Sequence, residues 1–311
     1  MTDKFNNMFL STQGCQNINL VSSLIKMATK QIAMISVFAA LCAVISRLPG
    51  IPIYGGAGKI EFTTVLFPIA GLIMGPGTGA LAVLIGNFVT WIIPTSTIMG
   101  LLLIPAGAFS ALIAGSLGRK DSLTNWRMAA IVLALIIFSW YLTPVGLEAP
   151  LYPLPHVAAL VLILAFRNKI FDFVQSPSKK KAILGTALCS YAGTMAEQLV
   201  GSLIFIGAVG LVVPLKAVRD AINSIGLLSV KLGLPTSIQT YIRGVSELLG
   251  IPKESAPSTL GILFMLMIPI VLTERLIITA VATSIGAATL RIIQKGRLGL
   301  PIMKRKENTK N

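Results

Sequence analysis

Four positions with polar side chains stand out within long apolar stretches of this sequence, where polar groups are costly and therefore informative. Asn87 precedes Trp91 by one helical turn, so both fall on the same face of a helix. Glu197 occurs in GTMAEQLVGSL, and Glu274 is followed directly by Arg275 in PIVLTERLIIT. Carboxylates and aromatic faces both attract cations. We therefore interpret Asn87, Trp91, Glu197 and Glu274 as candidate contacts of a small aromatic or nitrogen-rich substrate.

Two interpretations of the carboxylates remain open. At least one of them faces a substrate cavity, or else Glu197 or Glu274 pairs with Arg275 only to hold two helices together. Adjacent residues point about 100° apart on a helix, so residues 274 and 275 cannot face one small site equally well. Small residues four positions before and after Glu197, at 193 and 201, let a helix or a ligand approach closely. For Asn87 and Trp91, ligand contact and interhelical hydrogen bonding are equally consistent with the pattern.

The elements that position these side chains are membrane helices. The 311 residues are 54% hydrophobic and only 12% charged, and the mean hydropathy is +0.83. Soluble domains carry about 25% charged residues. We therefore predict an all-α, multi-pass protein of the cell membrane with about eight transmembrane helices. The predicted spans are 31–48, 62–75, 79–94, 98–117, 128–143, 155–170, 182–206 and 259–290.

The distribution of basic residues predicts that both termini are cytoplasmic. Under that topology 18 of the 26 Lys and Arg residues lie in cytoplasmic segments and seven in external ones. Residues 1–30 form a cytoplasmic tail, and 291–311 form a basic one. The net charge of +15 then reflects orientation and contact with anionic lipid, and we expect no nucleic-acid partner.

A glycine-rich break, GPGTG at 75–79, separates the second and third spans. Glycine tolerates positive φ, and Pro76 prevents the preceding helix from continuing. The break therefore predicts a tight interhelical turn between two short helices.

Two segments look like additions to a smaller bundle. Residues 128–170 are a possible inserted helical hairpin, with the only histidine, His156, in a proline-rich loop. Trp140, near the outer boundary of that hairpin, is interpreted as an interfacial anchor. Residues 207–258, within the last membrane region 182–290, form an external insertion with amphipathic helical spacing. It lies flat on the membrane surface or forms a lid.

Enzyme signatures are missing from the sequence. A single histidine excludes a two-histidine metal helix, and there is no nucleophile elbow or phosphate-binding loop. Cys15, Cys42 and Cys189 have no spacing typical of a disulfide or metal site. We expect no catalytic residue, no metal and no cofactor bound by this chain.

The N-terminal region resembles the substrate-binding S components of prokaryotic energy-coupling factor (ECF) transporters. The resemblance lies in ISVFAALCAVISRLP followed by IEFTTVLFPIAGLIMGPGTGALAVLIGNFV, and covers the first four membrane helices, 31–117. Ala39 and Ala43 match the family's AxxxA pattern, and Ser36 and Ala40 form a second small pair. These four residues are the expected contact with a scaffold subunit.

The resemblance implies vitamin or micronutrient uptake by a subunit that is not itself an enzyme. A scaffold membrane subunit and two ATPases, which use the ATP, would be its partners. Tyr54, Lys59 and Glu61 become gate or substrate-binding candidates in the first external loop. The family has six helices, and removing 128–166 from this chain leaves six. Riboflavin, thiamine, a nucleobase-like compound and a corrinoid remain undistinguished as substrates.

Two alternatives belong to other classes. A self-sufficient secondary transporter would show internal inverted repeats, and no sequence repeat is apparent. A membrane-embedded enzyme of lipid or polyprenyl metabolism would need clustered carboxylates or a basic cluster for a head group. Aspartate is absent from every predicted span.

Overall fold

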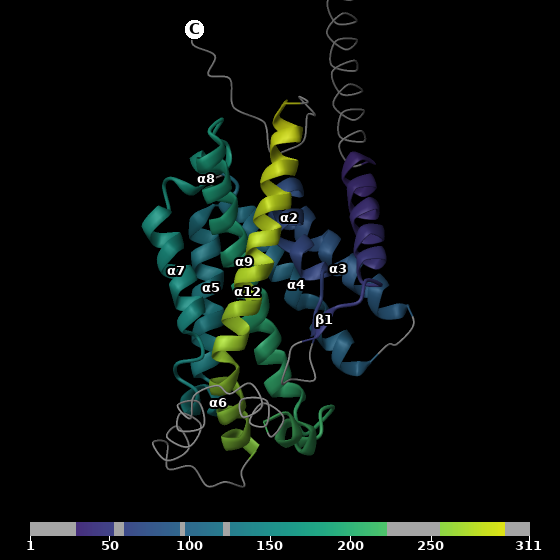
Figure 1. Cartoon of the computed structure of the whole chain (residues 1–311), viewed down its shortest axis with the longest axis vertical. Coiled ribbons are helices and arrows are strands. Elements are labelled where there is room, and N and C mark those ends of the chain that lie inside the picture. The colour runs from purple at the N-terminus through teal and green to yellow at the C-terminus, as the bar shows by residue number, and fades with distance from the viewer. Residues whose placement is uncertain (1–28, 53–58, 94–96, 121–124, 223–255, 296–311) are drawn as a thin grey trace, which may run out of the picture.

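The computed structural model describes residues 29–52, 59–93, 97–120, 125–222 and 256–295, which form a bundle of long helices (Figure 1). A helix occupies most of each of the eight predicted ranges, and the number that crosses the membrane stays a prediction. Two described helices, Ile98–Leu117 and Thr259–Lys295, are long and apolar enough to cross a membrane, and five shorter apolar helices accompany them. The elements are an N-terminal helix Thr29–Ile45, β1 (Ile51–Pro52), β2 (Lys59–Ile60), α2 (Thr63–Met74), α3 (Pro76–Ile92), α4 (Ile98–Leu117), α5 (Trp126–Tyr141), α6 (Pro144–Glu148), α7 (Leu154–Phe166), α8 (Ile170–Val174), α9 (Lys179–Ala208) and α12 (Ala256–Lys295).

The turn between α2 and α3 is shorter than predicted. Gly75 alone forms it, with φ of 91°, and α3 begins at Pro76. The expected five-residue turn over 75–79 is therefore wrong. Proline is favourable at the first helical position because its missing N–H would have no partner there. Arg119, at the end of α4, donates from Nη2 to the Met74 carbonyl at 3.2 Å and covers this turn.

Helix α2 lies at the centre of the bundle, and most of its residues are buried. It packs against α4 at very close range, because a Cβ on Gly71 would collide with the backbone of Ala111. A Cβ on Gly115 would lie 2.7 Å from the Gly71 carbonyl oxygen. Small residues thus let α2 and α4 approach without side chains between them.

The hairpin of α5, α6 and α7 packs on α9 rather than standing apart (Figure 1). Trp140 is fully buried, stacks on Tyr152 with ring centroids 4.7 Å apart, and donates from Nε1 to the Ala149 carbonyl at 3.3 Å. Its prediction as an interfacial anchor is therefore wrong. His156 is also fully buried and lies in the first turn of α7, not in a loop.

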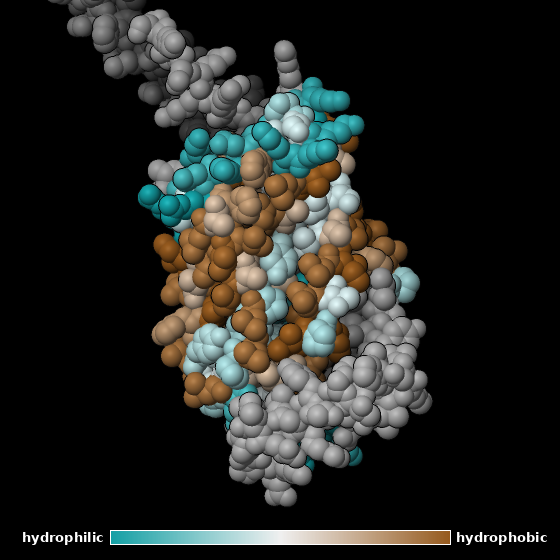
Figure 2. Space-filling view, turned by 60° about the vertical axis from the view of Figure 1, so that its left-hand side comes forward, coloured by the Kyte–Doolittle hydropathy of each residue, from teal (hydrophilic) through white to brown (hydrophobic). Residues whose placement is uncertain are grey.

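The surface has a hydrophilic end and a hydrophobic belt (Figure 2). Three basic residues, called the basic cluster below, lie against aromatic rings: Lys120 lies 5.8 Å from the Phe171 ring, and Arg127 and Arg167 each lie 5.6 Å from the Trp126 ring. The described chain starts and finishes at this same end (Figure 1). The arrangement suits the predicted topology, whose orientation stays a prediction. Exposed large apolar residues in the described part of the chain include Val37, Val44, Leu81, Phe88, Ile131, Leu135, Phe138, Val161 and Ile285.

The external insertion lies mostly outside the described residues. Its described part holds an isolated bridge between Val209 and Val213 and a helical stretch at 215–222. Whether the insertion is a lid or a surface helix pair stays a prediction.

Candidate functional site

A cavity of about 1000 Å³ lies between α2, α3, α4, α9 and α12. Residues that follow the N-terminal helix and connect α3 to α4, including Arg47 and Thr97, line it. These segments sit at the helix ends opposite those that carry the basic cluster, so the cavity lies toward the predicted outer side. Its polar and aromatic lining comprises Ser46, Arg47, Glu61, Thr63, Thr64, Phe67, Asn87, Thr90, Trp91, Thr97, Tyr152, Glu197, Gln198, Ser202, Phe205, Phe264, Glu274 and Arg275.

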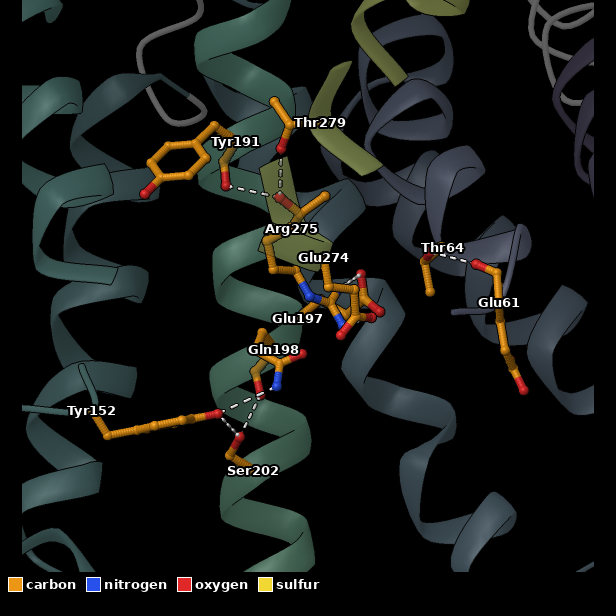
Figure 3. A network of polar contacts seen from close by, with 11 residues as sticks. Glu61, Thr64, Tyr152, Tyr191, Glu197, Gln198, Ser202, Glu274, Arg275 and Thr279 are labelled. Atoms are coloured by element: carbon orange, nitrogen blue, oxygen red, sulfur yellow. Dashed lines mark hydrogen bonds and ion pairs between the residues drawn. The ribbon is translucent and has the colours of Figure 1, made fainter. Parts of the chain in front are cut away.

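A charged cluster joins α9 to α12 at the cavity wall (Figure 3). Arg275 Nη1 lies 3.4 Å from Glu197 Oε2, and Arg275 Nη2 donates to Glu274 Oε1 at 3.3 Å. The three side chains are only 7–11% exposed. Glu274 and Arg275 both line the cavity, and the expectation that they do not face one small site equally well stays a prediction. The cluster is at once an ion pair between helices and part of a cavity wall.

The cluster leaves hydrogen-bonding capacity unused. Among the described residues, Arg275 Nε and Nη1 and Glu197 Oε2 have no hydrogen-bond partner. The 3.4 Å approach of Arg275 to Glu197 is thus electrostatic without hydrogen-bond geometry. A buried donor or acceptor without a partner is costly, and a bound molecule with adjacent acceptor and donor groups would supply the missing partners.

A second, neutral cluster lies beside the charged one. Tyr152 Oη lies 2.8 Å from Ser202 Oγ, and Gln198 Nε2 donates to Tyr152 Oη at 3.3 Å (Figure 3). Tyr152 comes from the segment between α6 and α7, and its ring also meets Phe264 of α12 at 4.8 Å. The hairpin therefore contributes a residue to the cavity wall.

Asn87 and Trp91 make interhelical and local hydrogen bonds while also lining the cavity. Asn87 Nδ2 donates to the Ile104 carbonyl of α4 at 3.2 Å, and Trp91 Nε1 donates to the Thr97 carbonyl at 2.9 Å. Thr97 caps α4 through its side chain, which accepts from the Gly100 N–H at 3.0 Å. Both residues therefore position the start of α4, and their role in ligand binding stays a prediction.

The predicted loop candidates are only partly described. Glu61 is exposed and lines the cavity, apart from the charged cluster (Figure 3). The backbone of Lys59 pairs with Pro52 in the β1–β2 ladder. Tyr54 lies outside the described residues.

The small residues that flank Glu197 have different neighbours. A Cβ on Gly193 would lie 2.8 Å from the Ser110 carbonyl oxygen of α4, so a helix approaches there. Gly201 lines the cavity, and a Cβ on it would meet only Leu103, at 3.7 Å. The sequence left open whether a helix or a ligand uses this face, and the helix occupies one end of it while the cavity occupies the other.

The N-terminal helix presents its two small pairs to different surroundings. Ala39 is buried, and its Cα would lie 3.5 Å from a Cβ on Gly86 of α3. Ala43 is half-buried, whereas Ser36 and Ala40 are exposed. Contact of these four residues with a scaffold subunit stays a prediction.

Sequence reasoning missed Tyr152, Gln198 and Ser202. Gln198 and Ser202 lie one turn apart on α9, a spacing that marks one polar helix face. Nothing in the sequence joins Tyr152 to that face, because 50 residues separate it from Ser202.

Comparisons with known proteins match parts of the chain. Residues 26–148 match the family model of the ECF-type riboflavin transporter, S component. An uncharacterised protein of Methanocaldococcus jannaschii is 32% identical over 151 residues, which are 48% of this chain and 50% of that protein. The chain thus spans about half the length of the curated relative it matches. No solved structure matches.

The family match covers less than half of the chain and likens residues 26–148 to the S components of ECF transporters. Together with the apolar helices, the match indicates a membrane protein. The family consists of transporter components and is not an enzyme family.

Proposed function

We propose that this chain is the membrane-embedded substrate-binding subunit of an ECF-type importer. It captures a vitamin or similar small micronutrient in the cavity between α2, α3, α4, α9 and α12. The observation that carries the proposal is the buried Arg275–Glu197 ion pair, because both residues line that cavity and, among the described residues, Arg275 Nε and Nη1 and Glu197 Oε2 have no hydrogen-bond partner. A cluster that served packing alone would satisfy these groups within the protein.

The chemistry of the cluster favours a ligand with a carbonyl acceptor beside an N–H donor. The acceptor would take a hydrogen bond from Arg275, and the donor would give one to Glu197. Nitrogen-rich heterocycles with alternating C=O and N–H groups have this pattern. Riboflavin, the substrate in the matched family's name, carries such an edge and is the first compound to test.

Binding is tested on the full chain purified in detergent. Titration with riboflavin, followed by quenching of its fluorescence, should give saturable binding to one site. Thiamine, a free nucleobase and a corrinoid, added as competitors, test the remaining substrates. If none of the four compounds binds, the vitamin-binding proposal is overturned.

Partner use needs a separate experiment. We propose that a scaffold membrane subunit and two ATPases associate with the chain through the exposed residues Ser36 and Ala40. Affinity purification from native membranes should recover these three partners. Ala40→Trp should reduce their recovery, whereas Ile131→Trp, at a 60% exposed position on α5, should not. Equal recovery with both variants would place the contact elsewhere, and recovery of the chain alone would favour a self-sufficient transporter.

A further inference from the structure

Three side chains at the cavity wall form a closed chain of hydrogen bonds (Figure 3). Tyr152 is 1% exposed and Ser202 is 5% exposed, whereas Gln198 is only half-buried. All three line the cavity. Ser202 Oγ also donates to the backbone carbonyl of Gln198 at 2.9 Å, which closes the chain onto α9.

Counting protons fixes the direction of every bond in this chain. A serine hydroxyl has one proton, and that of Ser202 goes to the Gln198 carbonyl. The proton in the 2.8 Å contact between Ser202 and Tyr152 must therefore come from Tyr152. Since Tyr152 has no second proton, it can only accept in its 3.3 Å contact with Gln198. The Gln198 amide must then present Nε2 to Tyr152.

The orientation of the Gln198 amide follows from this count. The oxygen and nitrogen of an amide side chain are assigned from their hydrogen-bond partners. Here the Tyr152 and Ser202 hydroxyls decide which atom of the Gln198 amide faces Tyr152. The side-chain oxygen Oε1 of Gln198 is left over. Among the described residues, none donates a hydrogen bond to it. It is therefore a free acceptor on a half-buried side chain at the cavity.

We infer that Gln198 Oε1 is a substrate-binding acceptor, and that Tyr152 and Ser202 are the positioning residues that aim it. This inference deepens the proposed function and rests on it. The second observation that points to a ligand is the neighbouring Glu197 Oε2, buried and without a hydrogen-bond partner. Two acceptors next to the Arg275 donors select a ligand with at least two N–H or O–H donors and one acceptor. A hydrogen bond from the hairpin thus determines specificity in the main bundle.

The first experiment observes the Gln198 amide without any ligand. In full-length protein labelled with ¹⁵N-glutamine, Gln198→Ala identifies the Gln198 side-chain resonance. Its N–H protons should exchange slowly with water in the wild type. Tyr152→Phe removes the acceptor, and Ser202→Ala lets the Tyr152 proton turn toward Gln198, so both variants should speed the exchange at least tenfold. Tyr191→Phe is the matched control, because Tyr191 Oη donates to the Pro155 carbonyl at 3.0 Å and joins α9 to α7 outside the cavity lining.

The second experiment measures riboflavin affinity in the same variants. Tyr152→Phe and Ser202→Ala should weaken binding at least tenfold, and Tyr191→Phe by less than twofold. Unchanged amide exchange in Tyr152→Phe, or an equal change in Tyr191→Phe, overturns the inference whatever the ligand. Equal affinity in Tyr152→Phe and the wild type overturns it as well. Absence of riboflavin binding in the wild type, with the expected amide exchange, would count against riboflavin as the substrate and leave the acceptor orientation supported.

Discussion

Two polar clusters begin at adjacent residues of α9 and line the same cavity, yet they use their hydrogen-bonding groups differently. The charged cluster of Glu197, Glu274 and Arg275 is a buried ion-pair cluster in which N–H groups of Arg275 and one carboxylate oxygen of Glu197 have no hydrogen-bond partner among the described residues. In the neutral cluster the Tyr152 and Ser202 hydroxyls are both satisfied, and one acceptor of Gln198 is left over. The difference suggests that the two clusters have different roles. The charged cluster supplies binding groups, and the neutral cluster fixes the orientation of the Gln198 side-chain amide.

The two clusters also differ in which part of the chain completes them. The charged cluster needs only α9 and α12, the two long helices near the middle of the bundle (Figure 1). The neutral cluster needs Tyr152 from the hairpin, which stacks on Trp140 and meets Phe264. The hairpin thus completes the neutral cluster, whereas the charged cluster is complete without it.

The largest effect is expected from removing the positive charge. Arg275→Gln leaves two buried carboxylates facing each other, and breaking a buried ion pair from one side costs about 3–5 kcal/mol of stability. Thermal unfolding of the purified protein in detergent measures the loss. The neutral triple variant Glu197→Gln, Glu274→Gln, Arg275→Gln should recover most of it. If Arg275→Gln unfolds like the wild type, the cluster is not electrostatically coupled.

A smaller difference is expected between the glycines that flank Glu197. Gly193→Ala forces a Cβ within 2.8 Å of the Ser110 carbonyl oxygen and should cost about 1–3 kcal/mol, as overpacking usually does. Gly201→Ala meets only an ordinary contact at 3.7 Å, so stability should hold and only ligand binding should change. Thermal unfolding measures the stability of both variants, and riboflavin titration measures their ligand affinity. Equal stability losses would mean that Gly201 packs against protein rather than facing the cavity.

Neutralising one carboxylate should affect binding more than folding. Glu197→Gln should weaken ligand binding by more than about 1.4 kcal/mol, a tenfold change, because it loses the charged acceptor at the cavity. Arg275 keeps its hydrogen bond to Glu274 in this variant, so the protein should remain folded. Unchanged affinity with an intact fold would favour a purely structural ion pair.

The smallest effect on stability is expected from removing a single tyrosine hydroxyl, and it tests whether the neutral cluster serves binding or packing. Tyr152→Phe and Tyr191→Phe each remove one tyrosine hydroxyl that joins the hairpin to α9. Each should cost about 1 kcal/mol of stability, the usual net value of a hydrogen bond. Their stabilities should therefore match while their ligand affinities differ. A much larger stability loss in Tyr152→Phe would mean that the neutral cluster mainly holds the hairpin in place.

The helices could be predicted from the sequence because long apolar runs have few other solutions in a membrane protein. The predicted span 98–117 coincides with α4, and α2 at Thr63–Met74 lies one residue inside its predicted range at each end. The turn was less predictable, since a proline after glycine can end one helix or begin the next. Trp140 was misassigned because an aromatic residue near a span end suits an interface and a buried core equally well.

The sequence by itself determined that this chain is a helical membrane protein with a few costly polar groups in its spans. It singled out Asn87, Glu197 and Glu274 as substrate-binding candidates because isolated polar residues stand out against apolar neighbours. Only the tertiary structure decided that Glu274 and Arg275 share one cavity with Glu197, since that depends on the rotation of α12 against α9. Only the tertiary structure places the Tyr152 hydroxyl beside that of Ser202. Contacts between residues distant in the chain depend on how whole helices pack, and no local pattern encodes that packing.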